Sequence, residues 1–222
     1  MAAVINPTSL SDVARLSRPL TLARDRLVPV LPALAGLVPE GGLQQGSTVA
    51  VEGDAATSLG LALAAGPSLA GAWVVVVGRA DLGLAAAAEA GVALDRLALV
   101  APPPPEHWAG VVAALIGSVG VVLVDPDHRV RAADARRLAA RARERGTLLI
   151  QMARGQGARG QGARGPARPG LEVDLRLQVV ESAWQGLGSG HGNLQARRVT
   201  VESGGRRHAA RPRRVELWLP DE

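Results

Sequence analysis

Residues 48–60 read TVAVEGDAATSLG, and they carry the clearest fold signal in the chain. Residues 48–52 have strand character, a turn of small residues begins at Gly53, and a helical segment follows over 57–65, which Gly66 and Pro67 should close. A strand, a small-residue turn and a helix in direct succession are the setting of a phosphate-binding P-loop. The stretch therefore predicts the opening unit of an α/β sheet, with a candidate ligand site at the turn.

The residues that give a P-loop its chemistry are absent from this turn. Counted from Gly53, the second glycine of the motif is Ser58, the lysine is Leu59 and the Mg²⁺-binding hydroxyl is Gly60. No lysine can come from elsewhere in the chain, because all 25 basic residues are arginines. Without that lysine the terminal phosphates of a nucleotide lose their charge partner. We expect no catalysis, no cofactor and at most a vestigial nucleotide loop, formed by Gly53, Asp54, Thr57 and Ser58.

Carboxylates near the turn have two interpretations. Asp54 places a negative charge beside any incoming phosphate, or it caps the helix that follows. Asp125 ends the aliphatic run 121–124, as a Walker-B aspartate does, and Asp127 and His128 follow it. This group suits either a divalent ion or a capping and turn cluster. The turn cluster is favoured, and we predict no metal site.

Strand-like and helix-like segments alternate on the carboxyl side of this stretch. Strands are expected at 72–77, 97–100, 121–124 and 148–152, and helices at 82–90, 106–116 and 132–145. This alternation predicts a mostly parallel central sheet flanked by helices. Three further strand-like segments, 171–182, 194–202 and 213–219, are separated by Gly-rich turns and predict a carboxyl-terminal antiparallel β-meander.

The positive charge lies in the second half of the chain. Residues 1–128 hold 6 Arg and 11 acidic residues, whereas residues 129–222 hold 19 Arg and 9 acidic residues. A basic half of this kind favours an anionic partner, with nucleic acid first, although a solvated basic surface or linker is the alternative. The predicted binding residues are Arg154, Arg159, Arg164 and Arg168 in a low-complexity loop, and Arg206, Arg207, Arg211, Arg213 and Arg214 near the carboxyl end.

Composition and targeting signals narrow the class of protein. The chain has no cysteine, which excludes disulfides, thiolate metal sites and cysteine nucleophiles. No charged segment followed by an apolar core opens the chain, and the uncharged stretch 55–78 is split by a turn, so we expect a cytoplasmic protein without a membrane span. We divide the chain into an amino-terminal extension (1–26), a core (27–202) with an Arg/Gly loop at 154–170, and a basic tail with a final strand (203–222).

The order of these features resembles the RecA ATPase core. Residues 35–46, AGLVPEGGLQQG, resemble the entry to that core, and residues 90–97, AGVALDRL, are similar to the segment before its third strand. The resemblance implies a RecA-like sheet. It also implies that the position of the catalytic glutamate falls at Arg79, or at Asp81 if the register slips by two. Neither residue restores a site that lacks lysine.

A RecA-like chain with a degenerate Walker A motif and an Arg/Gly-rich tail resembles the ImuA-type accessory proteins of the bacterial mutasome. The resemblance implies a non-catalytic role in the SOS response, in error-prone translesion synthesis. The partners it implies are an ImuB-type polymerase homologue and a DnaE-type error-prone polymerase, with DNA as a further candidate. Two other functions stay open: an atypical RecA-like ATP-binding DNA repair protein, and a SulA-like cell-division inhibitor. Self-association is also left open.

Overall fold

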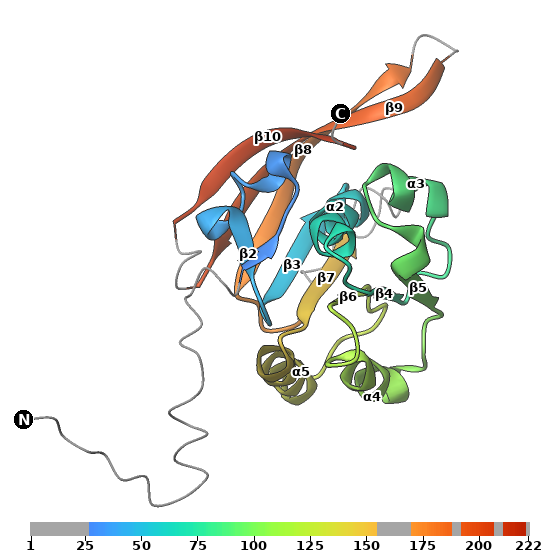
Figure 1. Ribbon diagram of the computed structural model, residues 1–222, viewed down its shortest axis with the longest axis vertical. Coiled ribbons are helices and arrows are strands. Elements are labelled where there is room, and N and C mark those ends of the chain that lie inside the picture. The colour runs from blue at the N-terminus through green and yellow to red at the C-terminus, as the bar shows by residue number, and fades with distance from the viewer. Residues whose placement is uncertain (1–26, 155–169, 188–191, 207–210, 221–222) are drawn as a thin grey trace, which may run out of the picture.

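An eight-stranded sheet forms the centre of the computed structural model, which describes residues 27–154, 170–187, 192–206 and 211–220 (Figure 1). The strand order is β10-β9-β8-β3-β7-β6-β4-β5. Strands β3, β7, β6, β4 and β5 run parallel, and β8 also runs parallel to β3. Their bounds are β3 (Thr48–Gly53), β4 (Val74–Val77), β5 (Leu97–Val100), β6 (Val121–Val124) and β7 (Leu148–Arg154).

Helices cover both faces of the parallel strands. Helices α2 (Ala56–Leu69) and α3 (Leu84–Glu89) lie on one face, and α4 (Pro105–Leu115) and α5 (Ala132–Arg145) lie on the other (Figure 1). Alternate residues of β4 therefore enter different cores: Val74 and Val76 pack under α2, whereas Val75 and Val77 pack under α4 and α5. This burial on both faces explains why the strands are continuous aliphatic runs.

The carboxyl part of the chain closes the sheet with antiparallel strands. These are β8 (Leu175–Leu187), β9 (Gly192–Gly205) and β10 (Arg213–Leu219). The ends of β8 and β9 extend beyond the neighbouring strands as a two-stranded arm (Figure 1). Strand β9 runs across the domain boundary that the sequence suggested at residue 202. Every residue of β10 pairs with a residue of β9.

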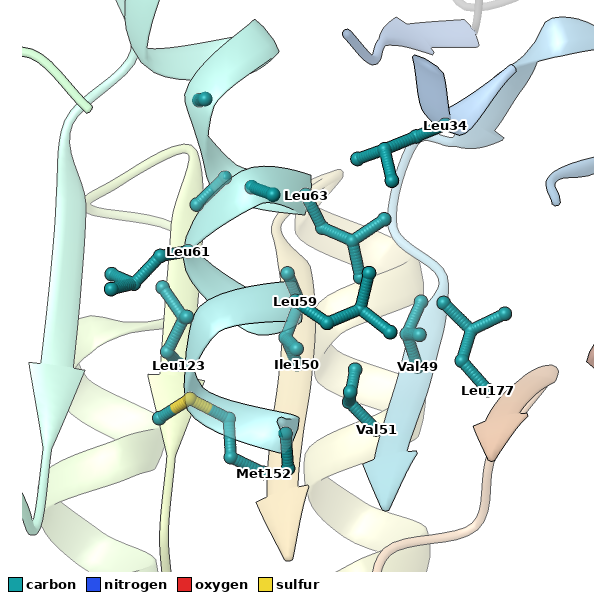
Figure 2. Packing of buried hydrophobic residues seen from close by; sticks show 14 of the residues in the cluster. Leu34, Val49, Val51, Leu59, Leu61, Leu63, Leu123, Ile150, Met152 and Leu177 are labelled. Carbon is teal, nitrogen blue, oxygen red and sulfur yellow. The ribbon is translucent and has the colours of Figure 1, made fainter. Parts of the chain in front are cut away.

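A small sheet of two strands precedes the central one. It consists of β1 (Leu27–Pro29) and β2 (Gly42–Gln44), which pair antiparallel and enclose two short 3-10 helices, η2 (Pro32–Leu34) and η3 (Pro39–Gly41). A third 3-10 helix, η4 (Leu94–Arg96), leads into β5. Leu34 from η2 is buried beside Leu63 and Leu59 of α2, and Figure 2 shows these side chains pointing toward Val49 and Val51 of β3. None of the elements expected from the sequence corresponds to this layer.

The predicted fold class is confirmed: the protein is an α/β sheet, mostly parallel, flanked by helices and closed by an antiparallel meander. Several predicted bounds differ from the structure: the strands expected at 171–182 and 194–202 are β8 (Leu175–Leu187) and β9 (Gly192–Gly205), and the predicted end of the first helix was wrong. Helix α2 does not stop at Gly66 and Pro67 but continues to Leu69, with Pro67 inside it. The helix is buried from Leu59 to Ser68, and this packing outweighs the one backbone hydrogen bond that a proline removes.

Some expectations concern residues outside the described ranges. The extension at 1–26 and residues 155–169 of the Arg/Gly loop lie there. The division of the chain into three parts stays a prediction. Within the described ranges no helix is both long and apolar enough to span a membrane.

Candidate functional site

The turn after β3 is shorter than a phosphate-binding loop. Helix α2 begins at Ala56, so only Asp54 and Ala55 separate it from the strand. Gly53 turns the chain with φ +111°, and a Cβ there would lie 2.7 Å from the Val179 carbonyl oxygen. The suggested capping role of Asp54 was wrong, because the N-cap is Ala55 and no side chain caps the helix. Residues that would wrap a phosphate in a P-loop are thus wound into the first turn of α2.

The position of the Mg²⁺-binding hydroxyl is closed by packing. Gly60 faces β7, and a Cβ at Gly60 would lie 2.9 Å from Sδ and 3.0 Å from Cγ of Met152. Figure 2 shows Met152 directly beneath this turn of α2, near Leu123 of β6. Met152 is buried, so a serine or threonine at position 60 would have to displace it. The floor of the site is filled by apolar side chains.

The guanidinium of Arg79 lies at the carboxyl edge of the sheet, between the turn and Asp125. Its Nη1 donates to Thr57 Oγ1 at 3.1 Å and to Asp125 Oδ2 at 3.3 Å, and its Nε donates to Asp81 Oδ1 at 2.9 Å. The side chain is only 11% exposed, whereas Asp81 is 71% exposed. Arg79 therefore joins the first turn of α2 to the loop after β6 through a largely buried cation.

Sheet topology explains how these residues meet. Strands β4 and β6 are parallel neighbours, so Arg79 and Asp125 leave the sheet at the same edge. Gly78 makes the approach possible, because it has φ +93° and a Cβ there would lie 2.7 Å from the Asp125 carbonyl oxygen. From the sequence alone Arg79 indicated only a lost glutamate, and its contacts with Thr57 and Asp125 were not expected.

The carboxylates of this edge are engaged in such contacts. Asp125 pairs with Arg79, and Asp127 Oδ1 lies 3.1 Å from His128 Nδ1. The described residues contain no group of three or more His, Asp or Glu side chains arranged to hold a metal ion. The predicted Walker-B-like position of Asp125 is thus at the expected edge of the sheet, and its partner there is a guanidinium.

Arg197 holds the turn from the other side. It lies on β9, its Nη1 donates to the Asp54 carbonyl oxygen at 3.0 Å, and its Nε donates to Ser182 Oγ on β8. Its guanidinium also stacks over the ring of Trp184, 5.0 Å from the centroid. Burial lowers the pKa of Arg197 from its usual value, and the charge of Asp54 opposes that shift. The β8–β9 arm is thereby fastened to the degenerate loop.

A pocket of about 280 Å³ opens beside this cluster. Its wall is largely apolar and comes from η2, α2, α3 and the end of β10, with Trp184 and Trp218 at its rim. Thr57, Ser58 and Arg79 supply its polar end. Of the four residues predicted for a vestigial loop, Thr57 and Ser58 line this pocket, whereas Gly53 is buried and Asp54 is exposed.

The predicted arginines differ in their surroundings. Arg213 donates to the carbonyl oxygens of Gly36, at 3.5 Å, and Val38. Arg214 pairs with Glu181 at 2.9 Å and with Glu202 at 3.2 Å. Both line a groove of about 790 Å³ over β8–β10, together with Arg206. Arg206 and Arg211 are exposed, Arg154 ends β7, and Arg159, Arg164, Arg168 and Arg207 lie outside the described residues.

Comparison with known proteins places the chain in a family. The model of the family described as MT3502 N-terminal domain matches residues 36–157. The chain belongs to this family. The matched range of the MT3502 N-terminal domain family includes the degenerate loop, Arg79, Asp125 and α5, and it ends before β8.

A curated relative and a solved structure add to this assignment. The uncharacterized protein Rv3395c of Mycobacterium tuberculosis is 39% identical over 131 residues, which are 57% of this chain and 63% of that protein. The chain thus spans less than two thirds of that relative. The crystal structure of the RadB recombinase is similar to this chain, with a TM-score of 0.55 and 17% sequence identity. The match covers 83% of this chain and 92% of the RadB chain. The fold of this MT3502 N-terminal domain family member is therefore RecA-like.

Proposed function

We propose that this chain is a RecA-like protein of DNA repair that does not hydrolyse ATP and acts as an accessory or scaffold protein. The observation that carries the proposal is the Arg79 guanidinium, which binds both Thr57 and Asp125. A P-loop enzyme uses the corresponding places for the phosphate loop and for the carboxylate that binds Mg²⁺. In this chain a fixed cation of the protein itself occupies the space between them.

Electrostatics argue against a nucleotide–magnesium complex at this site. The Arg79 guanidinium lies 3.3 Å from Asp125, so a divalent cation bound to the same carboxylate would meet a like charge at close range. Gly60 offers no hydroxyl, and Met152 fills the space that one would need. A phosphate would also find no lysine, because the chain contains none. Each of the three usual contributions to phosphoryl transfer is therefore weakened.

The finer assignment is to the ImuA-type accessory proteins of error-prone translesion synthesis. It rests on the degenerate Walker A motif, the Arg/Gly-rich segment and the basic second half of the chain. The proposed partners are an ImuB-type polymerase homologue and a DnaE-type error-prone polymerase, and DNA is the proposed anionic ligand. Because the arginines on β10 already bind protein groups, the proposal does not require them to contact DNA.

The test of the non-catalytic role is ATP turnover by the purified chain with Mg²⁺. We expect release of phosphate no faster than from an Asp125→Ala variant, and no heat of Mg-ATP binding in calorimetry. The Asp125→Ala variant is the matched control, since contaminating ATPase activity survives it. Turnover that disappears in Asp125→Ala would instead establish the atypical ATPase named above.

The accessory role is tested by co-purification with the two polymerases. We expect this chain to form a complex with the ImuB-type homologue that elutes as one species in size-exclusion chromatography. Failure to bind either polymerase, combined with inhibition of the polymerisation of the tubulin-like division protein, would replace the repair role with that of a division inhibitor.

A further inference from the structure

A basic surface that the sequence analysis did not single out lies on α5 and the loop before it. We call it the α5 basic face. It consists of Arg129, Arg131, Arg136, Arg137, Arg141, Arg143 and Arg145, all of them exposed. Residues 129–145 contain only two acidic side chains, Asp134 and Glu144. This stretch of seventeen residues thus holds seven of the chain's arginines against two opposing charges.

The sheet holds this surface in a fixed shape. Ala135, Leu138, Ala139 and Ala142 are buried against the sheet, so the opposite side of α5 faces solvent. Arg137, Arg141 and Arg145 follow one another at intervals of four residues. Successive guanidinium groups on this line are therefore offset by about 6 Å along the helix, from a rise of about 1.5 Å per residue. A rigid helix with arginines at regular intervals suits a ligand with regularly spaced charges.

Most of this charge is not neutralised by the protein. Arg137 pairs with Asp134 at 2.8 Å, and Arg143 lies 3.6 Å from Asp174. Arg136, Arg141 and Arg145 form no ion pair within the described residues, although Glu144 is exposed near them. Arg198 on β9 and Arg214 on β10 differ, because both pair with glutamates. Among the residues that the structure describes, the densest group of exposed arginines without an ion pair therefore lies on α5 and the loop before it.

We propose that the α5 basic face binds the sugar-phosphate backbone of a nucleic acid. The inference rests on the proposed function, because it takes DNA as the anionic ligand, and it assigns the contact to a helix of the folded body. Strands β6 and β7 are parallel neighbours, so the loop before α5 and Arg154 at the end of β7 lie at the same edge of the sheet.

The chemistry of the face fixes the kind of recognition. Guanidinium groups donate paired hydrogen bonds to phosphate oxygens and release counterions from the nucleic acid. Residues 129–145 include no aromatic side chain that could stack on a base. Binding is therefore indifferent to sequence and weakens steeply with salt. Single-stranded and double-stranded DNA share this backbone chemistry, and both are used in the test.

The experiment measures binding of fluorescent 30-nucleotide single strands and 30-base-pair duplexes by anisotropy over a range of salt concentrations. The variant carries Arg136→Gln, Arg141→Gln and Arg145→Gln, because glutamine keeps helix propensity and removes charge. The matched control carries Arg96→Gln, Arg176→Gln and Arg198→Gln, which remove the same charge from other surfaces. Thermal unfolding of both variants confirms that they are folded.

We expect the α5 variant to bind about tenfold more weakly and the control to bind like the unaltered chain. The slope of log K against log salt on single strands should become shallower by about 2, because each of three lost phosphate contacts contributes about 0.7.

Equal losses of affinity in both triple variants would assign the effect to net charge and overturn the inference. Unchanged binding by the α5 variant would do the same while leaving the proposed function intact. No binding by the unaltered chain would remove DNA from the proposed function itself, and capture of an acidic protein by α5 would reassign the face.

Discussion

The sequence and the structure suggest opposite roles for Arg79. In the sequence, the resemblance to RecA-like enzymes implies that the position of the catalytic glutamate falls at Arg79, or at Asp81 if the register slips by two, so Arg79 indicates a lost function. In the structure its guanidinium donates to side chains from three different segments, at Thr57, Asp81 and Asp125. Hydrogen bonds to charged groups contribute about 1.5–3 kcal/mol each when they are sheltered from water. Arg79 thus contributes to the stability of the site.

The substitution Arg79→Met tests this contribution at the residue scale. Methionine keeps much of the side-chain volume but leaves Asp125 and Thr57 without the guanidinium. We expect the free energy of unfolding to fall by about 2 kcal/mol, since Asp125 is mostly sheltered from solvent. Urea unfolding followed by circular dichroism gives the value. Asp81→Asn is the control, and it should cost less than about 1 kcal/mol because Asp81 is 71% exposed. Equal effects of the two substitutions would contradict this ranking.

Helix α2 shows how packing overrides local signals. Gly66 and Pro67 mark a helix end in sequence, yet both lie inside α2. Gly66 is required because the helix approaches β1 there: a Cβ would lie 2.3 Å from the Pro29 carbonyl oxygen and 3.0 Å from the Val30 Cα. The glycine therefore serves a close approach of two backbones, and its weak helix propensity is offset by that contact.

At the scale of the element, two glycine-to-alanine substitutions separate the effect of close backbone approach from the effect of helix propensity. Gly66→Ala should lower the free energy of unfolding by at least about 2 kcal/mol, because the backbone of β1 must move away. Gly110→Ala, in the middle of α4, should raise it by about 0.5–1 kcal/mol, because, apart from the backbone of α4 itself and the adjacent residues, nothing lies within 4 Å of a Cβ at that position. Thermal or urea unfolding of the two variants gives the comparison. A stabilising Gly66→Ala would show that α2 and β1 are not in contact as described.

The two halves of the chain, which differ in charge, share one sheet. Strand β3, from the acidic half, lies between β7 and β8 from the basic half. Asp174 accepts from the Thr48 backbone N–H at 3.0 Å and fixes the start of β8 beside β3. On the outer strand Leu217 and Leu219 of β10 enter the same core as the side chains of α2. The carboxyl-terminal strands therefore belong to the folded body.

Cooperative unfolding is expected at the scale of the whole molecule. Leu217→Ala in β10 removes a buried side chain and should lower the free energy of unfolding by about 2–4 kcal/mol. If the sheet unfolds as one unit, hydrogen exchange should show the same loss of stability at amides of β6, which is separated from β10 by β9, β8, β3 and β7. Glu216→Gln is the control, because Glu216 precedes Leu217 in the chain and its side chain is exposed. It should change the stability in both measurements by less than about 1 kcal/mol relative to the unaltered chain. Loss of protection confined to β9 and β10 would instead support a separate tail.

Much of the fold could be predicted from the sequence, because local patterns determine it. Strands 97–100, 121–124 and 213–219 and helix 132–145 have the predicted bounds, since aliphatic runs, amphipathic spacing and a terminal Gly146 with φ +75° act over a few residues. The absence of lysine and the degenerate loop were equally visible in the sequence. A pattern that acts within a single helix or strand can be recognised without knowing how the strands are arranged in the sheet.

The contacts of the site were decided by the tertiary structure alone. Arg79 is 22 residues from Thr57 and 46 from Asp125, and only the adjacency of β4 and β6 joins their ends at one edge. Arg197 reaches Asp54 across 143 residues for a similar reason. No local pattern encodes such distances, because they depend on which strands pair and on which glycines permit close backbone approach. The absence of the P-loop lysine is visible in the amino-acid sequence, whereas the arginine between loop and carboxylate is placed there by the order of the strands.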